Sequence, residues 1–201
     1  MLKIGLTGGI GCGKSAVLAL FKSYNIQTID ADYEAKQLMG AGSAVLEAVF
    51  DHFGKAYQLE NGELDRKKLR SLVFSDSQAL QDLELITHPA IKERLLFMMS
   101  SSSFSPYIVV DIPLLFEKGY QSIFDAVIVV DCTVEQQYNR VKIRDNVTDI
   151  QTKKIVDTQM ERADRIDNAD FIIDNTKSIA QLVPQVESLH NQLLARNSAN
   201  R

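Results

Sequence analysis

The feature that most constrains the fold and the ligand of this chain is the segment Gly8–Ser15, which reads GGIGCGKS. It fits the pattern G-x-x-x-x-G-K-[ST], with the fixed positions at Gly8, Gly13, Lys14 and Ser15. The glycines let backbone N–H groups converge on a polyphosphate, since a Cβ at these positions would block the approach. Lys14 supplies a mobile positive charge for the β- and γ-phosphates, and Ser15 supplies a hydroxyl for Mg²⁺. The pattern therefore predicts a phosphate-binding loop.

The flanking sequence gives this loop the context that it needs. Residues 1–7 (MLKIGLT) are apolar enough for a short buried strand, and residues 16–24 (AVLALFKSY) predict a helix. In this order, the positive end of the helix would point at the bound anion. A glycine-rich turn that fits by chance is the alternative, and both flanks argue against it. We therefore predict that the protein binds a nucleoside triphosphate.

Composition narrows the choice of partners. The chain has 201 residues, which suits one domain with room for an inserted subdomain, and 45% hydrophobic content is ample for a core. A net charge of −4 argues against nucleic acid as the main partner, because neutralising phosphates needs a basic surface. The two cysteines, Cys12 and Cys132, offer neither a disulfide framework nor a metal-ligand cluster. With no signal peptide and no membrane-length apolar run, we expect a cytoplasmic protein without a membrane partner.

Four later segments predict further strands of a buried parallel sheet. Their near-continuous apolar runs suit strands that are covered on both faces. Three of them end in an acidic residue and the fourth has one next to its last position, as expected where strands bring polar groups to the carboxyl edge of a sheet. The segments are 26–30 (IQTID), 107–112 (YIVVDI), 126–131 (AVIVVD) and 171–174 (FIID). With helices between them, we predict an α/β protein of the P-loop NTPase class, a three-layer fold with a five-stranded parallel sheet.

Residues 33–99 show only helical periodicity and turns, which predicts a helical subdomain inserted between the second and third strands. Within it, 44–53 and 66–74 look amphipathic, and Asp65 is expected to cap the second of these helices. A further helix is expected over 76–86, with a break at His88-Pro89 and a restart at Ala90. In a small nucleotide enzyme, such an insertion is where a second substrate would be bound.

Two segments near the C-terminus carry signals for helix starts. Thr148–Gln151 has the form of a capping box and predicts a helix that runs to about Glu161. Ser178–Gln181 repeats the pattern before the last helix. Pro184 either kinks that last helix or marks its true first turn.

Other signals favour a small-molecule kinase among the proteins that carry such a loop. A GTPase would have N-K-x-D after a strand, and the sequence has none. Asp51–Gly54 fits D-x-x-G, but it lies in a helical region with no preceding strand, so chance explains the match. The chain is also short, and poor in basic surface, for a helicase-type motor.

A kinase then needs a base beside the acceptor hydroxyl, a carboxylate that organises the metal, and arginines that offset charge on the transferred group.

Carboxylates at strand ends are candidates for the first two roles. Asp30 and Asp32 follow the second strand, next to the phosphate-binding loop, and either can face the γ-phosphate. Asp30 can equally cap the next helix. Asp111 ends an apolar run of the Walker-B kind, and Asp131 ends a similar run. The pattern alone does not rank these last two.

Arginines for the third role cluster between the fourth and fifth strands. Arg140 and Arg144 are one helical turn apart, and Arg162 and Arg165 follow after the capped helix. A solvated charged face is the ordinary explanation for such a set. Small kinases carry an arginine-bearing lid in this interval, which favours the functional interpretation here.

Six ordered blocks of sequence also match the pattern of one known family. They are Ile4–Ser15, Asp30–Asp32, His88-Pro89, Asp111–Glu117, Gln159-Met160, and Ala169-Asp170 with Ile173–Asn175. On these blocks the chain resembles the dephospho-coenzyme A kinase family along almost its whole length. Several blocks span more than one residue, and DIPLLFE at 111–117 is the most distinctive, so the resemblance is far more specific than the phosphate-binding loop alone.

The resemblance implies transfer of the γ-phosphate of ATP to the 3′-hydroxyl of the ribose in dephospho-CoA, the last step of CoA synthesis. The catalytic residues would be Asp32, as general base or hydroxyl-orienting group, with Lys14 and Arg140 stabilising the phosphoryl group. Mg²⁺ would be bound by Ser15 and Asp111. The ATP-binding residues would be Gly9, Gly11, Cys12, Gly13, Lys14, Ser15, Ala16, Arg144 and Asn175. The acceptor would be bound by Thr7, Asp32, His88, Pro89, Asp111, Pro113, Leu114, Leu115, Phe116 and Glu117.

We therefore expect a single P-loop kinase domain over residues 1–201. Its core would comprise 1–32, 105–134 and 168–196, with a helical acceptor-binding insertion at about 33–104 and a helical lid at about 135–167. The partner would be the small molecule dephospho-CoA rather than a nucleic acid or a membrane. The sequence does not predict an oligomeric state.

The chain departs from the family pattern at two positions. Cys12 stands where the family usually has Ser, and a thiol beside a helix N-terminus is expected to have a lowered pKa. We hypothesise mild sensitivity to oxidants on this ground. Arg165 stands where a Lys is common, which keeps the charge and changes the donor geometry, so its role stays open.

Two alternative functions remain at this point. One is another P-loop metabolite kinase, of nucleoside, shikimate or gluconate type; the helical insertion and the DIPLLFE block favour the CoA precursor over those acceptors. The other is a regulatory protein that binds ATP, hydrolyses it slowly and transfers nothing. Asp32 and the pair of arginines argue against it, because a pure binder needs neither.

Overall fold

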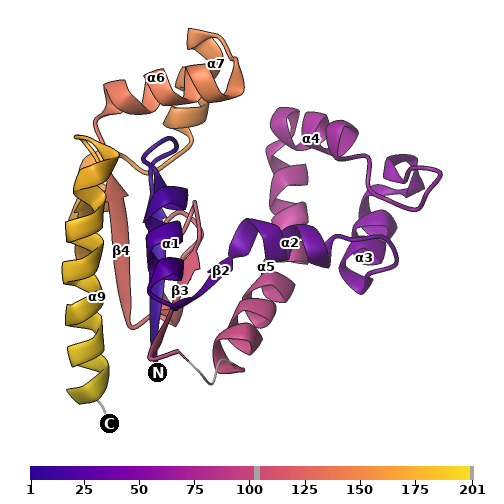
Figure 1. Cartoon of the computed structure of the whole chain (residues 1–201). Coiled ribbons are helices and arrows are strands. Elements are labelled where there is room, and N and C mark those ends of the chain that lie inside the picture. The colour runs from indigo at the N-terminus through magenta and orange to yellow at the C-terminus, as the bar shows by residue number, and fades with distance from the viewer. Residues whose placement is uncertain (102–104, 200–201) are drawn as a thin grey trace. The chain divides into compact units, whose positions relative to one another are not determined.

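The computed structural model describes residues 1–101 and 105–199. The chain forms two compact units. One unit comprises Met1–Asp30 and Ser102–Arg201, and we call it the core unit; the other comprises Ala31–Ser101, and we call it the helical unit (Figure 1). The expected end of the insertion, near residue 104, falls in 102–104, outside the described residues.

The core unit contains a five-stranded, fully parallel sheet with the strand order β2-β3-β1-β4-β5. The strands are β1 (Leu2–Gly8), β2 (Gln27–Asp30), β3 (Tyr107–Asp111), β4 (Ala126–Asp131) and β5 (Phe171–Asp174). This confirms the predicted α/β fold and all five predicted strands, with end differences of one residue. The central strands are apolar and buried throughout, as expected for strands covered on both faces.

Strand register brings the acidic strand ends into pairs. Asp30 lies opposite Asp111, and Asp131 lies opposite Asp174. Asp111 is also opposite Leu6 of β1, one residue before Thr7. The carboxyl edge of the sheet therefore collects carboxylates beside the strand that leads into the phosphate-binding loop, as the sequence predicts.

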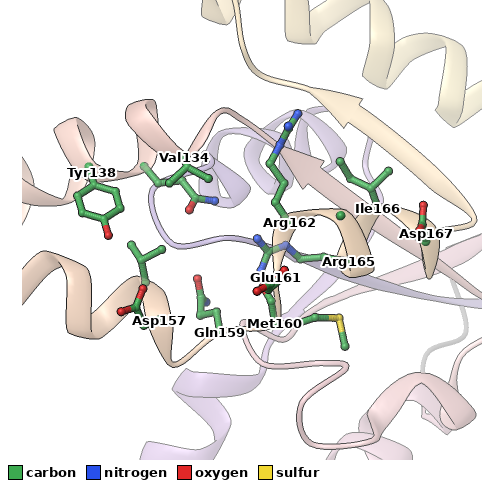
Figure 2. A pocket seen from close by; sticks show the side chains of 13 residues that line it. Val134, Tyr138, Asp157, Gln159, Met160, Glu161, Arg162, Arg165, Ile166 and Asp167 are labelled. Atoms are coloured by element: carbon green, nitrogen blue, oxygen red, sulfur yellow. Dashed lines mark hydrogen bonds between the residues drawn. The ribbon is translucent and has the colours of Figure 1, made fainter.

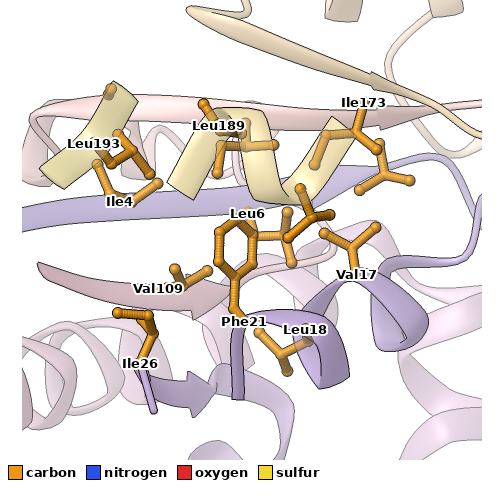
Figure 3. Packing of buried hydrophobic residues seen from close by; sticks show 14 of the residues in the cluster. Ile4, Leu6, Val17, Leu18, Phe21, Ile26, Val109, Ile173, Leu189 and Leu193 are labelled. Carbon is orange, nitrogen blue, oxygen red and sulfur yellow. The ribbon is translucent and has the colours of Figure 1, made fainter. Parts of the chain in front are cut away.

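The main hydrophobic core lies between the sheet and two helices, α1 (Lys14–Ser23) and α9 (Leu182–Ala199). Figure 3 shows Phe21 of α1 and Leu189 of α9 facing strand residues such as Ile4. The opposite face of the sheet is covered by the segment after β3, where a Cβ at Gly5 would collide with Leu115 and Phe124. A short 3-10 helix, η2 (Tyr120–Ile123), lies in this segment.

The start of the last helix differs from the prediction. The Ser178 side chain accepts no capping hydrogen bond, and Ile179–Gln181 form a 3-10 turn, η3. Helix α9 begins at Leu182, and Pro184 lies in its first turn. A proline there removes no helical hydrogen bond, because first-turn N–H groups have no partner within the helix. Of the two roles considered for Pro184, the first-turn role is therefore confirmed, and the predicted capping box is wrong.

The helical unit contains α2 (Ala31–Leu38), α3 (Ala44–Phe53), α4 (Arg66–Ser75), α5 (Ser77–Ser100) and the 3-10 helix η1 (Lys55–Tyr57). Its own small core is built around Leu46, Val49, Phe50, Leu64 and Leu69. The predicted cap is confirmed, because the Asp65 carboxylate accepts the Lys68 N–H at 2.9 Å.

Helix α5 contradicts the predicted break at His88-Pro89. It runs without interruption from Ser77 to Ser100, with Pro89 inside it. The proline lacks one N–H donor and crowds the carbonyl four residues earlier. Packing overrides this cost, because α2, α3 and α4 all contact α5 and because Thr87, Leu95 and Met99 are buried on either side of the proline.

Three helices follow β4, namely α6 (Val134–Asp145), α7 (Asp149–Asp157) and α8 (Arg162–Asp167). The capping box at Thr148 is confirmed, and a second one at Thr133 starts α6. Helix α7 ends at Asp157, earlier than the predicted Glu161. The residues between α7 and α8 instead form a turn whose backbone is used for contacts with other segments, described below. Among the described residues, no helix combines the length and apolarity that crossing a membrane requires.

Candidate nucleotide-binding site

The phosphate-binding loop, Gly8–Ser15, connects β1 to α1 and adopts a compact turn. The Cys12 N–H donates to the Gly9 carbonyl at 3.0 Å. Gly13 is the N-cap of α1 with φ +92°, a left-handed conformation that disfavours any side chain. A Cβ at Gly13 would also collide with the Asn175 amide nitrogen. The last fixed glycine of the motif is therefore required both by the backbone and by its neighbour.

The two polar side chains of the motif stand at the start of α1. Lys14 folds back across the loop, and its Nζ donates to the Gly8 carbonyl at 3.1 Å. Ser15 is exposed, and Ala16 N–H donates to the Gly13 carbonyl at 3.1 Å. Lys14 thus already spans the loop, so its ammonium lies where a bound polyphosphate would need a cation.

Arg140 and Asn175 join the loop from distant parts of the chain. Arg140, on α6, donates to the Gly11 carbonyl and to the Asn175 carbonyl, each at 3.1 Å. The Asn175 side-chain amide donates to the Cys12 carbonyl at 2.7 Å. Two loop carbonyls, those of Gly11 and Cys12, are therefore held by side chains that are far away in sequence.

Arg144 lies one turn beyond Arg140 on α6 and does not join this network. Its guanidinium forms two bonds with the Asp145 carboxylate, at 2.7 and 2.8 Å, and its side chain is 59% exposed. The Asp145 carboxylate raises the pKa of the Arg144 guanidinium. The sequence pattern could not separate the two arginines, because only the fold decides which carbonyls each one meets.

The turn between α7 and α8 is a part of this site that sequence reasoning did not include among the site residues. The Gln159 Oε1 accepts the Ile10 N–H of the loop at 2.7 Å. The next residue, Met160, donates its N–H to Glu117 Oε1 at 2.7 Å. The turn therefore links the loop to the Pro113–Glu117 segment. Gln159 and Met160 do form one of the six matching sequence blocks, and that match was the signal that could have indicated them.

Two further arginines hold this region together. Arg165, whose role the sequence left open, is buried in α8 and donates to the Met160 carbonyl at 3.0 Å. Arg162 makes a bidentate pair with the buried Asp131, with distances of 2.8 and 2.6 Å. The Asp131 carboxylate raises the pKa of Arg162. The pair gives Asp131 a structural partner within the core unit.

A cavity of about 790 Å³ lies beside these groups. Figure 2 shows its lining, which comes from α6 and from the segment between α7 and the end of α8 and includes Gln159, Arg162 and Arg165. The lining carries both signs of charge, since Asp157, Glu161 and Asp167 also contribute. The full lining is Val134, Gln137, Tyr138, Val156, Asp157, Gln159, Met160, Glu161, Arg162, Ala163, Arg165, Ile166 and Asp167.

The residues expected to bind the acceptor divide between the two units. In the core unit, the Thr7 hydroxyl donates to the Pro113 carbonyl at 3.3 Å. The Pro113–Glu117 segment forms a turn after β3, in which Leu115 is fully buried and Leu114 and Phe116 are half-buried. Leu115 packs against β1 at Gly5, so its side chain is part of the core in this structure.

In the helical unit, Asp32 is exposed in the first turn of α2, and His88 and Pro89 lie in the middle of α5. Helices α2 and α5 pack together. An ion pair between Arg94 of α5 and the buried Glu34 of α2, at 2.9 Å, fixes this packing. The first turn of α2 and the middle of α5 thus belong to one rigid element pair.

This sheet order, with a glycine-rich loop between the first strand and the first helix, defines the P-loop kinase class. The solved structure of a shikimate kinase from Bacteroides thetaiotaomicron has the same fold, with a TM-score of 0.55 over 96% of this chain and 98% of that one at 15% identity.

The chain belongs to the dephospho-CoA kinase family, whose model, described as "Dephospho-CoA kinase", matches residues 2–181. A relative of that name from Shewanella oneidensis is 39% identical over 191 residues, covering 95% of this chain and 93% of the relative. The structure of a dephospho-CoA kinase from Campylobacter jejuni superposes with a TM-score of 0.74 at 29% identity, covering 97% of this chain and 98% of that one.

Proposed function

We propose that this protein is a phosphotransferase that moves the γ-phosphoryl group of ATP to the ribose 3′-hydroxyl of dephospho-CoA, giving CoA and ADP. Membership of the dephospho-CoA kinase family supports the choice of acceptor. The observation that carries the chemistry is the phosphate-binding loop, whose carbonyls are bonded by Arg140 and Asn175. The reaction completes CoA synthesis, and we place it in the cytoplasm, where ATP is available to biosynthetic enzymes.

On the ATP side, the proposed contacts are backbone N–H groups of the loop and the side chains at the start of α1. Gly9, Gly11, Cys12, Gly13 and Ala16 would contribute through the backbone. Lys14 would exchange its bond to the Gly8 carbonyl for phosphate oxygens. Arg140 would approach the transferred phosphoryl group from α6, and Asn175 would lie beside the nucleotide. Arg144 would first have to leave the Asp145 carboxylate.

We assign Mg²⁺ to the Ser15 hydroxyl and the Asp111 carboxylate. Within the described residues, no three His, Cys, Asp or Glu side chains gather as a metal cage. The donor set nevertheless suits Mg²⁺, which keeps several waters and takes only one or two protein oxygens when it also binds phosphates. Held by these two residues, the ion would offset the negative charge of the phosphates.

On the acceptor side, we propose Asp32 as the group that accepts or orients the proton of the 3′-hydroxyl. Asp32 is an exposed residue in the first turn of α2. His88 and Pro89 of the helical unit would contact the acceptor, as would Thr7, Asp111 and the segment Pro113–Glu117 of the core unit. The segments expected as insertion and lid, about 33–104 and 135–167, keep those proposed roles.

The deciding experiment measures ADP release by the purified protein with Mg-ATP, with and without dephospho-CoA. Adenosine and shikimate serve as control acceptors. Stimulation by dephospho-CoA alone, with a product of the mass of CoA, is the expected result. Stimulation by a control acceptor would overturn the substrate and keep the kinase chemistry. A folded sample that binds ATP and responds to no acceptor would instead favour a regulatory ATP-binding protein.

A further inference from the structure

The two cysteines of the chain meet beneath the phosphate-binding loop. Cys12 lies inside the loop, and Cys132 follows the last residue of β4. Their Sγ atoms are 2.7 Å apart, although the residues are 120 positions apart in sequence. Both are free thiols, and their residues are only 1% and 0% exposed. A disulfide has an S–S length of about 2.05 Å, so a small closing movement would bond the two sulfurs.

The surroundings of the pair make one sulfur the nucleophile. The contact with the Cys132 thiol lowers the pKa of Cys12 to about 7; the Gln137 amide, at 3.1 Å, and the Arg165 cation act in the same direction. Burial and the Asp131 carboxylate oppose them. The contact with Cys12, together with burial, raises the pKa of Cys132. Of the two thiols, Cys12 is therefore the one that loses its proton more readily.

The buried pair lies next to a cavity, with Gln137 in contact with both. Gln137, which donates to the Cys12 sulfur, also lines the cavity of about 790 Å³. For a reagent to pass from the cavity to the Cys12 sulfur, the buried Gln137 side chain would have to move aside. A peroxide is small enough for such a route.

We propose that Cys12 and Cys132 form a reversible disulfide, with a peroxide as oxidant, that ties the phosphate-binding loop to the end of β4 and weakens ATP binding. The Cys12 thiolate attacks one peroxide oxygen, the O–O bond breaks, and hydroxide leaves, which gives a sulfenic acid. The Cys132 sulfur then attacks the Cys12 sulfur, its proton goes to the departing oxygen, and water leaves. In total, two thiols and one hydrogen peroxide give one disulfide and two waters. Dithiol reagents reverse the bond by exchange.

The effect on ATP follows from the position of Cys12 within the loop. Its N–H and its carbonyl are already bonded to Gly9 and Asn175. A covalent bond from its side chain to β4 would remove the remaining freedom of the loop to adjust around a triphosphate. The bond would also take from Gln137 the anionic acceptor to which it donates. This dithiol site is independent of the identity of the acceptor.

The test treats the purified full-length protein with hydrogen peroxide. Peptide mapping without reductant is expected to find the two cysteine-containing peptides joined, with a mass lower by two hydrogen atoms than that of the separate thiols. A fluorescent ATP analogue, titrated without any acceptor, is expected to bind several-fold more weakly, and dithiothreitol is expected to restore both readouts. Cys132→Ala should bind the analogue normally before oxidation and should form no intramolecular disulfide.

Three results would overturn the proposal. One is a peroxide-treated wild-type protein in which both thiols still react with iodoacetamide after unfolding. Another is a disulfide that forms and leaves affinity for the ATP analogue unchanged. The third is an equal, dithiothreitol-reversible loss of affinity in Cys132→Ala. The wild-type mass measurement stands even if the variant fails to fold, and every readout is independent of whether dephospho-CoA is the acceptor.

Discussion

Arg140 and Asn175 of the core unit reach the phosphate-binding loop across 129 and 163 positions of sequence. The helices of the helical unit, by contrast, are capped by side chains only two or three positions away, as Asp65 caps α4 and Asp76 caps α5. The nucleotide side of the site thus depends on the assembled fold. Helices α4 and α5 of the helical unit, by comparison, begin at caps that are set by neighbouring residues in sequence.

The comparison predicts that a substitution in the helical unit can remove chemistry without removing ATP binding. Asp32→Asn should lower kcat by about 10²- to 10⁴-fold, the usual range for a base or orienting group. Affinity for ATP should persist, because Asp32 belongs to the helical unit. Steady-state kinetics and titration with an ATP analogue measure the two quantities. Asp51→Asn, an exposed change on α3, is the matched control. Near-normal turnover in folded Asp32→Asn protein would remove this residue from the mechanism.

A substitution in the loop should affect binding and chemistry together. Lys14→Ala removes the cation that spans the loop, and we expect turnover to fall by roughly 10²- to 10³-fold, as for other groups that stabilise developing charge. The dissociation constant for ATP should rise as well. Lys22→Ala, near the exposed end of the same helix, controls for general charge loss. If Lys14→Ala lowered kcat and left the dissociation constant for ATP unchanged, the proposed difference between the core unit and the helical unit would be wrong.

The two arginines of α6 offer a sharper test, since they share a helix and differ in tertiary contacts. Arg140→Ala loses bonds to two loop-region carbonyls, and we expect the KM for ATP to rise roughly 10-fold, because a bond to a charged group contributes about 1.5–3 kcal/mol. Arg144→Ala removes an exposed pair, and exposed pairs contribute about 0.2–1 kcal/mol, so its effect should be smaller. Equal effects would show that the network seen here does not govern ATP binding.

The smallest effect is expected from the proline inside α5. Pro89→Ala restores a helical hydrogen bond, and we expect the free energy of unfolding to rise by about 1 kcal/mol. A proline in a helix interior costs about 3 kcal/mol relative to alanine. Alanine also gives the unfolded chain more conformational freedom, which offsets up to about 1 kcal/mol of the gain. The rest of the difference is smaller than in an ideal helix because α5 has adapted to the proline. Urea unfolding measures the change. If Pro89 also contacts the acceptor, the variant should show a higher KM for dephospho-CoA; a destabilised variant would contradict the structural account.

Local sequence rules were sufficient wherever a short segment sets its own conformation. The phosphate-binding loop, the five strands, the Asp65 cap and the Thr148 capping box were all predictable, because glycine freedom, apolar runs and side-chain oxygens act over a few residues. The same rules failed at Pro89 and Ser178. In α5, burial on both sides of the proline outweighed a missing hydrogen bond, and before α9 a 3-10 turn displaced the expected cap.

The sequence by itself determined the class of this protein, because the residues that wrap a polyphosphate are contiguous and the strand ends carry their acids in order. Only the tertiary structure decided which of several chemically equal groups joins the loop. In the folded chain Arg140 bonds to the loop, whereas Arg144 pairs with Asp145. Asp131 pairs with Arg162. Gln159 accepts the Ile10 N–H, and the sulfur of Cys132 lies against that of Cys12. The Arg162–Asp131 pair spans 31 positions of sequence, and the contacts of Arg140, Gln159 and Cys132 with the loop span more than 100. No local pattern encodes distances between segments that far apart.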